Sequence, residues 1–159
     1  SLDKKIFQET GIKLSEKLIE KVPLIYSSKT FASVAYRWKT QFNENSKIMA
    51  FNNQLSELNH NELAGITNLQ ANFHCIILKS DLDTHRIVKR MQITKKHLRK
   101  RNIDVTEISI KGDTLLTKLF STIHIGDWTT YFLALRYMTN PTPVNEIETF
   151  KKELGSFIQ

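Results

Sequence analysis

Two titratable residues in this chain each stand between a pair of asparagines, and together they suggest acid–base chemistry. Glu44 and His60 are sixteen residues apart. The flanking amides are Asn43 and Asn45 around the glutamate, and Asn59 and Asn61 around the histidine. A glutamate and a histidine can divide acid and base roles when their surroundings set their pKa values. The amides could orient either group or bind a polyol ligand, but asparagines are also common at helix ends and turns. Spacing alone leaves both interpretations open.

The remaining histidines give less support for chemistry. His74 lies in an apolar run, and three others fall on expected helices: His85, His97 and His124. No pair has the H-x-x-x-H or C-x-x-C spacing of a metal site, and no nucleophile elbow supports a Ser-His-Asp arrangement. We therefore expect neither a metal ion nor a cofactor.

Length and composition are those of one globular domain. The 159 residues are 40% hydrophobic and 25% charged, enough to bury a core. No run approaches 18 consecutive apolar residues, so we expect no membrane span. The single cysteine, Cys75, lies in the apolar run FHCIIL, which predicts a buried, inert thiol and fits a reducing cytoplasm. The first residues, SLDKK, lack an initiator Met and a signal-peptide core, and suggest a piece of a longer protein.

The formal charge of +7 raises the question of an anionic partner. Residues 89–101 (KRMQITKKHLRKR) hold seven Lys or Arg and no acid. Nucleic acid or a phosphorylated substrate would explain this run, as would a solvated helix face near a helix C-terminus. The run has no interleaved aromatic residue and no known nucleic-acid signature. We expect no nucleic-acid partner.

Apolar periodicity predicts helices that alternate with strands. Helices are expected over 3–21 (ended by Pro23), 30–43, 83–101 (with Asp83 as N-cap), 113–138 (which Gly126 could interrupt) and 144–154. Strands are expected over 24–26, 47–51, 72–79 and 104–110, and residues 58–66 are expected to be a loop entering a helix. This alternation predicts an α/β fold, a parallel sheet flanked by helices on both faces. Ligands of such sheets gather at the carboxyl ends of the strands, where residues 27–30 and 52–60 would lie.

Two blocks of sequence resemble a known family. AYRWKTQFNENSK (35–47) followed by ELNHNE (57–62) resembles the second sugar-isomerase (SIS) domain of archaeal and bacterial bifunctional phosphoglucose/phosphomannose isomerases. That family carries A-x-R-x-K-x-Q-x-N-E-N-A-K and then E-L-N-H-N-E. The stretches IGDWTTYFLAL (125–135) and NPTPVNEIETFKKEL (140–154) are similar to its G-D-x-x-S-x-Y-L-A and D-P-T-P-V-x-x-I-x-x-L-K. The similarity covers most of residues 22–154 and implies a flavodoxin-like, three-layer αβα SIS domain.

The resemblance also implies roles for individual residues. Glu44 would be the base that carries a proton between C1 and C2 through a cis-enediol, and His60 would help to open the sugar ring across a dimer. Lys151 or Lys152 would assist near the ring oxygen. The asparagines Asn43, Asn45, Asn59 and Asn61 would contact sugar hydroxyls. Ser28 is a further substrate-binding candidate, although it could instead cap the next helix.

The chain departs from the family in a few places. Ser27 and Ser28 replace glycine after the first strand, Asn140 replaces aspartate, and Thr129 and Thr130 replace a more serine-like pair. The family's first SIS domain, with its S-x-S-G-x-T phosphate cradle, has no counterpart here. We therefore expect an entry helix over residues 1–21 and a second SIS domain over 22–159.

The leading hypothesis is half of a cytoplasmic, homodimeric isomerase of carbohydrate metabolism. It would interconvert glucose 6-phosphate and mannose 6-phosphate with fructose 6-phosphate, and the chain alone would fold with little or no activity. A non-catalytic SIS module that binds sugar phosphate for regulation is the alternative, although a sensor needs no proton shuttle. A basic nucleic-acid-binding protein is the third hypothesis, which a salt-dependent shift on duplex DNA would favour.

Overall fold

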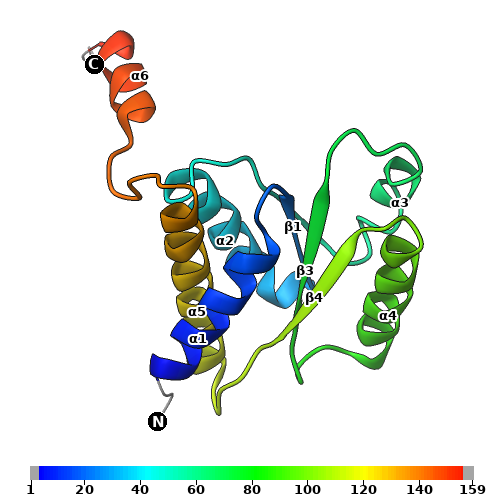
Figure 1. Cartoon of the computed structure of the whole chain (residues 1–159). Coiled ribbons are helices and arrows are strands. Elements are labelled where there is room, and N and C mark those ends of the chain that lie inside the picture. The colour runs from blue at the N-terminus through cyan, green and yellow to red at the C-terminus, as the bar shows by residue number, and fades with distance from the viewer. Residues whose placement is uncertain (1–3, 156–159) are drawn as a thin grey trace.

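A four-stranded parallel sheet lies at the centre of the protein (Figure 1), in a computed structural model that describes residues 4–155. The strands are β1 (Val22–Ser27), β2 (Phe51–Gln54), β3 (Phe73–Lys79) and β4 (Asp104–Ser109), in the order β2-β1-β3-β4. All three neighbouring pairs are parallel. The order reverses between β1 and β3, which is the doubly wound arrangement. The predicted fold class is confirmed.

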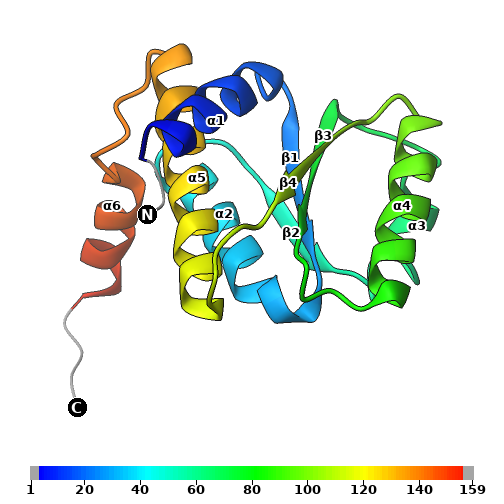
Figure 2. The same cartoon turned by 90° about the horizontal axis from the view of Figure 1, so that it is seen from below.

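Helices cover both faces of the sheet, so the domain has three layers (Figure 2). One face carries α1 (Lys4–Lys17), α2 (Ala32–Glu44) and α5 (Leu115–Arg136), and the other carries α3 (Glu62–Gly65) and α4 (His85–Arg99). A short 3-10 helix, η1 (Lys29–Phe31), precedes α2, and α6 (Asn145–Leu154) projects from the body (Figure 1). Within residues 4–155, no helix combines the length and the apolar character that crossing a bilayer requires.

The core consists of two clusters, one on each face of the sheet, because side chains of a strand point alternately to its two faces. Ile76 and Leu78 of β3 pack on the α2 side with Trp38 and Phe42 among others. Cys75 and Ile77 pack on the α4 side with residues such as Met91. β3 is therefore buried on both faces, in agreement with its nearly continuous apolar sequence. Burial raises the pKa of the Cys75 thiol, so this side chain behaves as a small apolar group.

The predicted strand over 47–51 is wrong, because residues 45–50 form a turn after α2 and the strand begins only at Phe51. Lys47 takes a left-handed backbone conformation with φ 57°. The amide Nδ2 of Asn43 donates to the Ile48 carbonyl at 2.8 Å, which closes the turn. Ala50 is fully buried in the core next to α2. The apolar run KIMAF thus reflects a turn that buries Ala50 and leaves Met49 exposed, and not an extended strand.

Three helix details also differ from prediction. The first helix ends at Lys17, well before Pro23, which lies inside β1, and its predicted first residue, Asp3, lies outside the described residues. Thr84 caps α4 by accepting a hydrogen bond from the Ile87 N–H, whereas the Asp83 carboxylate accepts from the Ser80 N–H at 2.7 Å. α5 runs through Gly126 without a break. Trp38 packs against Gly126, and its Nε1 donates to the Thr122 carbonyl at 2.9 Å.

Candidate functional site

Glu44 is the last residue of α2, directly after the predicted helix end at residue 43, and its side chain is exposed at the edge of a groove of about 620 Å³. The turn after α2 forms one wall of this groove. The approach to α6 forms the other, with Thr139, Asn140, Pro143, Val144, Asn145, Glu146 and Ile147. Lys47 also lines the groove, and its ammonium group donates to the Glu44 carbonyl and, at 3.4 Å, to the Pro141 carbonyl. The groove therefore brings a carboxylate, a cation and apolar walls together.

The two asparagines beside Glu44 hold its backbone in place. Asn43 bonds to the Ile48 carbonyl, as described above, and Asn45 Nδ2 donates to Thr130 Oγ1 at 2.9 Å. Ser46 Oγ adds a bond of 2.8 Å to the Thr130 carbonyl. The end of α2 is thus fixed to the middle of α5, and the Glu44 side chain starts from a defined position.

His60 lies in the turn between β2 and α3, as predicted, and its side chain is exposed. Asn59 ties this turn to α4: its Nδ2 donates to Thr94 Oγ1 at 2.7 Å, and its Oδ1 accepts from Arg90 at 3.3 Å. Asn61 Nδ2 donates to Glu57 Oε1 at 3.0 Å, inside the same turn. All four flanking amides therefore have partners within the domain.

The structure does not bring His60 to Glu44. Leu55 and Leu58, in the same turn as His60, belong to the core cluster on the α4 side of the sheet. Phe42, two residues before Glu44, belongs to the cluster on the opposite side. In one chain the sheet separates the two groups.

The two candidate lysines lie on the projecting helix α6, which has no buried residue (Figure 1). Lys151 Nζ pairs with Glu148 Oε1 at 2.9 Å. Within residues 4–155, Lys152 has no ion pair. The groove beside Glu44 reaches α6 only as far as Ile147, so the two lysines lie beyond its lining.

Ser28 follows the carboxyl end of β1, next to the point where the strand order reverses. It precedes η1 as the N-cap residue but forms no capping bond through its side chain, and its buried Oγ has no hydrogen-bond partner in the described chain. Capping therefore does not explain Ser28. Because α2 runs back from this edge to the other, Ser28 and Glu44 lie at opposite ends of α2.

One network of polar side chains was not predicted from the sequence. Glu62 accepts from the Tyr26 hydroxyl at 2.5 Å and from Asn53 Nδ2 at 2.7 Å, and so joins α3 to β1 and β2. Burial, with help from this carboxylate, raises the pKa of Tyr26, which keeps the phenol protonated as a donor. The network anchors the segment that carries His60. Residues 4–155 contain no group of three His, Cys, Asp or Glu side chains able to hold a metal ion.

Comparison with known structures and sequences identifies the family of this chain. A glucose-6-phosphate isomerase-like protein from Thermus thermophilus has the same fold, with a TM-score of 0.71 at 22% identity over 89% of this chain and 46% of that chain. Residues 7–154 match the family described as bacterial phospho-glucose isomerase C-terminal SIS domain. This chain belongs to that family.

Two curated relatives carry the same name, bifunctional phosphoglucose/phosphomannose isomerase. The protein from Thermoplasma volcanium is 41% identical over 138 residues, which are 86% of this chain and 44% of the relative. The protein from Aquifex aeolicus is 36% identical over 151 residues, or 92% of this chain and 47% of the relative. This chain thus spans less than half the length of these relatives.

Proposed function

We propose that this chain supplies the proton-transfer residues of an isomerase that interconverts glucose 6-phosphate and mannose 6-phosphate with fructose 6-phosphate. The observation that carries the proposal is the placement of Glu44, an exposed carboxylate on a backbone fixed from both sides, at the edge of an open groove. The names of the curated relatives supply the reaction.

Glu44 is the base in this proposal. Its carboxylate removes the proton from C2 of the open-chain aldose, and the cis-enediolate forms with its negative charge on O1. A proton moves from O2 to O1 and the same carboxylate returns the carbon-bound proton to C1, which gives the ketose, so one group serves both steps at carbon without a change of position. A fixed carboxylate suits this task because misplacement of the base is costly in rate. Lys47, beside the groove, can stabilise negative charge that develops on the enediol oxygens.

Other groups complete the site, some of them from elsewhere in the assembly. His60 opens the sugar ring of a substrate held by the other subunit of a homodimer, since the sheet separates it from Glu44 of its own chain. Lys151 or Lys152 assists at the ring oxygen. Ser28 and the flanking asparagines remain candidates for binding the sugar.

A first SIS domain supplies the phosphate site, residues 22–159 form the second SIS domain, and residues 1–21 lead into it. The enzyme would act in the cytoplasm, in glycolysis and gluconeogenesis.

The alternative is an SIS module that binds sugar phosphate without converting it. Such a module has no use for a base, whereas Glu44 is held rigidly and left accessible. The two functions differ in one measurable respect, because the regulatory module would bind hexose phosphates and never exchange the C2 proton with solvent.

The test is turnover of glucose 6-phosphate and of mannose 6-phosphate by the parent chain with its first SIS domain, with coupled detection of fructose 6-phosphate. Glu44→Gln should lower kcat about a thousandfold, the usual contribution of a general base. Glu9→Gln, at an exposed position on α1, is the matched control and should leave kcat unchanged. Binding without turnover by the wild type would instead establish the regulatory module.

A further inference from the structure

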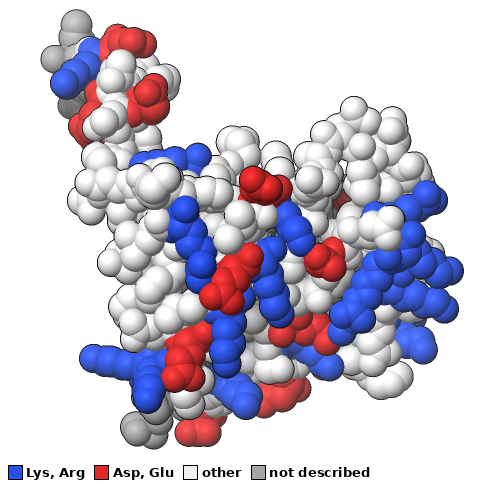
Figure 3. All heavy atoms as spheres, in the orientation of Figure 1, with Lys and Arg blue, Asp and Glu red and all other residues white. Residues whose placement is uncertain are grey.

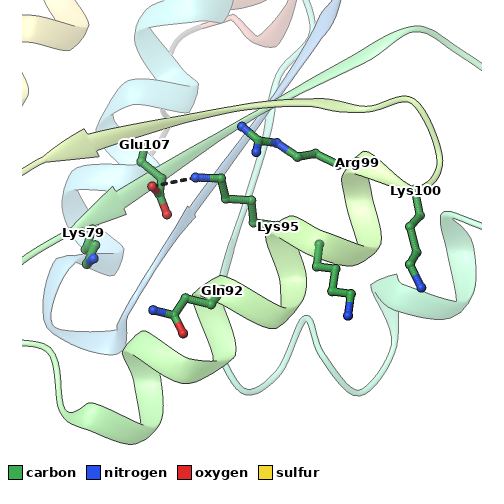
Figure 4. Close-up of a pocket in the computed structure, with 7 residues that line it drawn as sticks. Lys79, Gln92, Lys95, Arg99, Lys100 and Glu107 are labelled. Atoms are coloured by element: carbon green, nitrogen blue, oxygen red, sulfur yellow. Dashed lines mark hydrogen bonds and ion pairs between the residues drawn. The ribbon is translucent and has the colours of Figure 1, made fainter.

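A basic groove lies on the other side of the sheet from α2, between α4 and the edge strand β4. Figure 3 shows Lys and Arg side chains crowded over α4, and Figure 4 shows the groove between this helix and the strands. Its volume is about 650 Å³. The lining consists of Lys79, Gln92, Lys95, Lys96, Arg99, Lys100 and Glu107. Five cations therefore face a single carboxylate.

That carboxylate neutralises only one of the cations. Lys95 Nζ pairs with Glu107 Oε2 at 2.8 Å, as the dashed line in Figure 4 marks. Within residues 4–155, none of the other four cations in the lining has a carboxylate within ion-pair distance. The lining thus carries more positive than negative charge, and this excess favours an anion, although Arg99 also interacts with the Asp104 carboxylate beyond ion-pair distance.

The C-terminus of α4 accounts for only part of this charge. Cations stabilise a helix in its last turn, where Lys96 and Arg99 lie. Lys79, however, ends β3 and gains nothing from the helix dipole. Lys95 and Arg99, like Lys96 and Lys100, are also four residues apart, a spacing at which like charges repel along a helix. A ligand with several negative charges would relieve this repulsion.

The shape and chemistry of the lining narrow the class of anion. The groove follows α4 from Gln92 to Lys100, a rise of about 12 Å at 1.5 Å per residue. The cations of α4 lie in the part of the groove from Lys95 to Lys100. No aromatic ring lines the groove, so there is no platform on which a nucleobase could stack. The groove therefore suits an elongated anion with repeated charges that needs no stacking.

We propose that the groove between α4 and β4 binds linear oligophosphate, through charge-assisted hydrogen bonds from Lys79, Lys96, Arg99 and Lys100. The phosphate chain could be free or belong to a nucleotide, and in both cases the groove recognises the phosphates alone. Glu107 opposes binding, because its carboxylate forms an ion pair with Lys95 and repels the negatively charged ligand. Binding in this groove does not involve Glu44, since α4 and Glu44 lie on opposite sides of the sheet.

The test is calorimetric titration of the 159-residue chain with inorganic tripolyphosphate at low salt. The double variant Lys96→Gln/Lys100→Gln should lose about tenfold or more in affinity. Arg86→Gln/Lys89→Gln removes the same charge from exposed positions of α4 outside the groove, and should lose less than about threefold. Thermal melting of each variant verifies that it is folded.

A further variant should strengthen the binding of tripolyphosphate instead of weakening it. Glu107→Gln frees Lys95 and removes the repulsion, so tripolyphosphate should bind several-fold more tightly. ATP should bind no more tightly than tripolyphosphate if only the phosphates are recognised. Equal losses in the two double variants, or no gain from Glu107→Gln, would overturn the proposal. Tighter binding of duplex DNA, lost in the groove variant, would replace it with a nucleic-acid surface.

Discussion

Glu44 and His60 lie on opposite sides of the central sheet. The end of α2 packs with the cluster that contains Phe42, and the His60 turn packs with the cluster that contains Leu58. If both groups act on one sugar phosphate, they must come from two chains. A symmetric dimer would then hold two equivalent sites, each with one group from either subunit.

This arrangement predicts complementation between inactive variants of the parent enzyme. Glu44→Gln and His60→Ala should each be inactive alone, but a refolded equal mixture should recover about a quarter of wild-type activity. Half of the dimers are then mixed, and each mixed dimer has one intact site of two. The measurement is the isomerase rate after joint refolding.

The control for complementation uses a chain that lacks both groups. A mixture of Glu44→Gln with the double variant Glu44→Gln/His60→Ala contains no intact site and should stay inactive. If the first mixture also stays inactive although mixed dimers form, His60 does not act across a dimer.

The second prediction concerns the anchoring of the His60 turn. Asn59→Ala removes the bond to Thr94, whose hydroxyl is fully buried and would be left without its partner. The free energy of unfolding should fall by about 1–3 kcal/mol, and amide exchange over residues 55–61 should become faster. Hydrogen exchange measured by mass spectrometry would test this.

Asn61→Ala is the matched control for Asn59→Ala. Asn61 bonds only within its own turn, to an exposed Glu57, so its removal should change stability by less than about 0.5 kcal/mol. Equal effects of the two variants would show that the turn does not depend on α4.

The fold could be predicted because local periodicity determines the class of each element. The continuous apolar run in β3 and the three- and four-residue spacing in α2 have few other interpretations. The run KIMAF did have another, because a turn that buries an apolar residue and a short strand can have similar sequences. Only the contacts of Asn43 and Ala50 with the rest of the domain decide between them.

The positions of the candidate residues in the fold could be predicted one by one, but their arrangement relative to one another could not. The sequence places Glu44 at a helix end and His60 in a loop, and both placements are correct. Their separation by the sheet depends on which face each segment packs against, which no local pattern records. The partners of Asn45 and Asn59 are likewise distant, at Thr130 and Thr94. The sequence could not show that these amides are already occupied within the domain.

The third prediction tests the close packing of α2 on α5. A Cβ added at Gly126 would lie 2.5 Å from Trp38 Nε1, the donor to the Thr122 carbonyl. Gly126→Ala should therefore destabilise the chain by about 1–3 kcal/mol through overpacking, despite the better helix propensity of alanine. Urea unfolding measures this change.

Gly65 offers the matched control, since an added Cβ there meets nothing within 4 Å. Gly65→Ala in α3 should be neutral or stabilising by up to about 1 kcal/mol. A stabilising effect at both glycines would mean that Trp38 can move aside without cost.

The fourth prediction follows from His74, which is 2% exposed in β3. Its Nε2 lies 2.9 Å from Thr106 Oγ1, and its Nδ1 has no hydrogen-bond partner in the described chain. Burial, reinforced by the charge of Lys21, lowers the pKa of His74 from 6.5 to about 4. The folded protein therefore holds this imidazole neutral at pH values where the unfolded chain would protonate it.

The lower pKa of His74 in the folded state than in the unfolded state determines how the free energy of unfolding changes with pH. Between about pH 6.5 and pH 4 the unfolded state binds more protons at His74, so stability rises with pH. The contribution is fully present above 6.5 and is lost as the pH falls toward 4, by an amount on the order of 3 kcal/mol. Urea unfolding at a series of pH values should show a smaller slope in this window for His74→Gln than for the wild type. His85→Gln, which removes an exposed histidine, tests whether loss of any histidine has the same effect, and an equal reduction in both variants would rule out His74 as the cause.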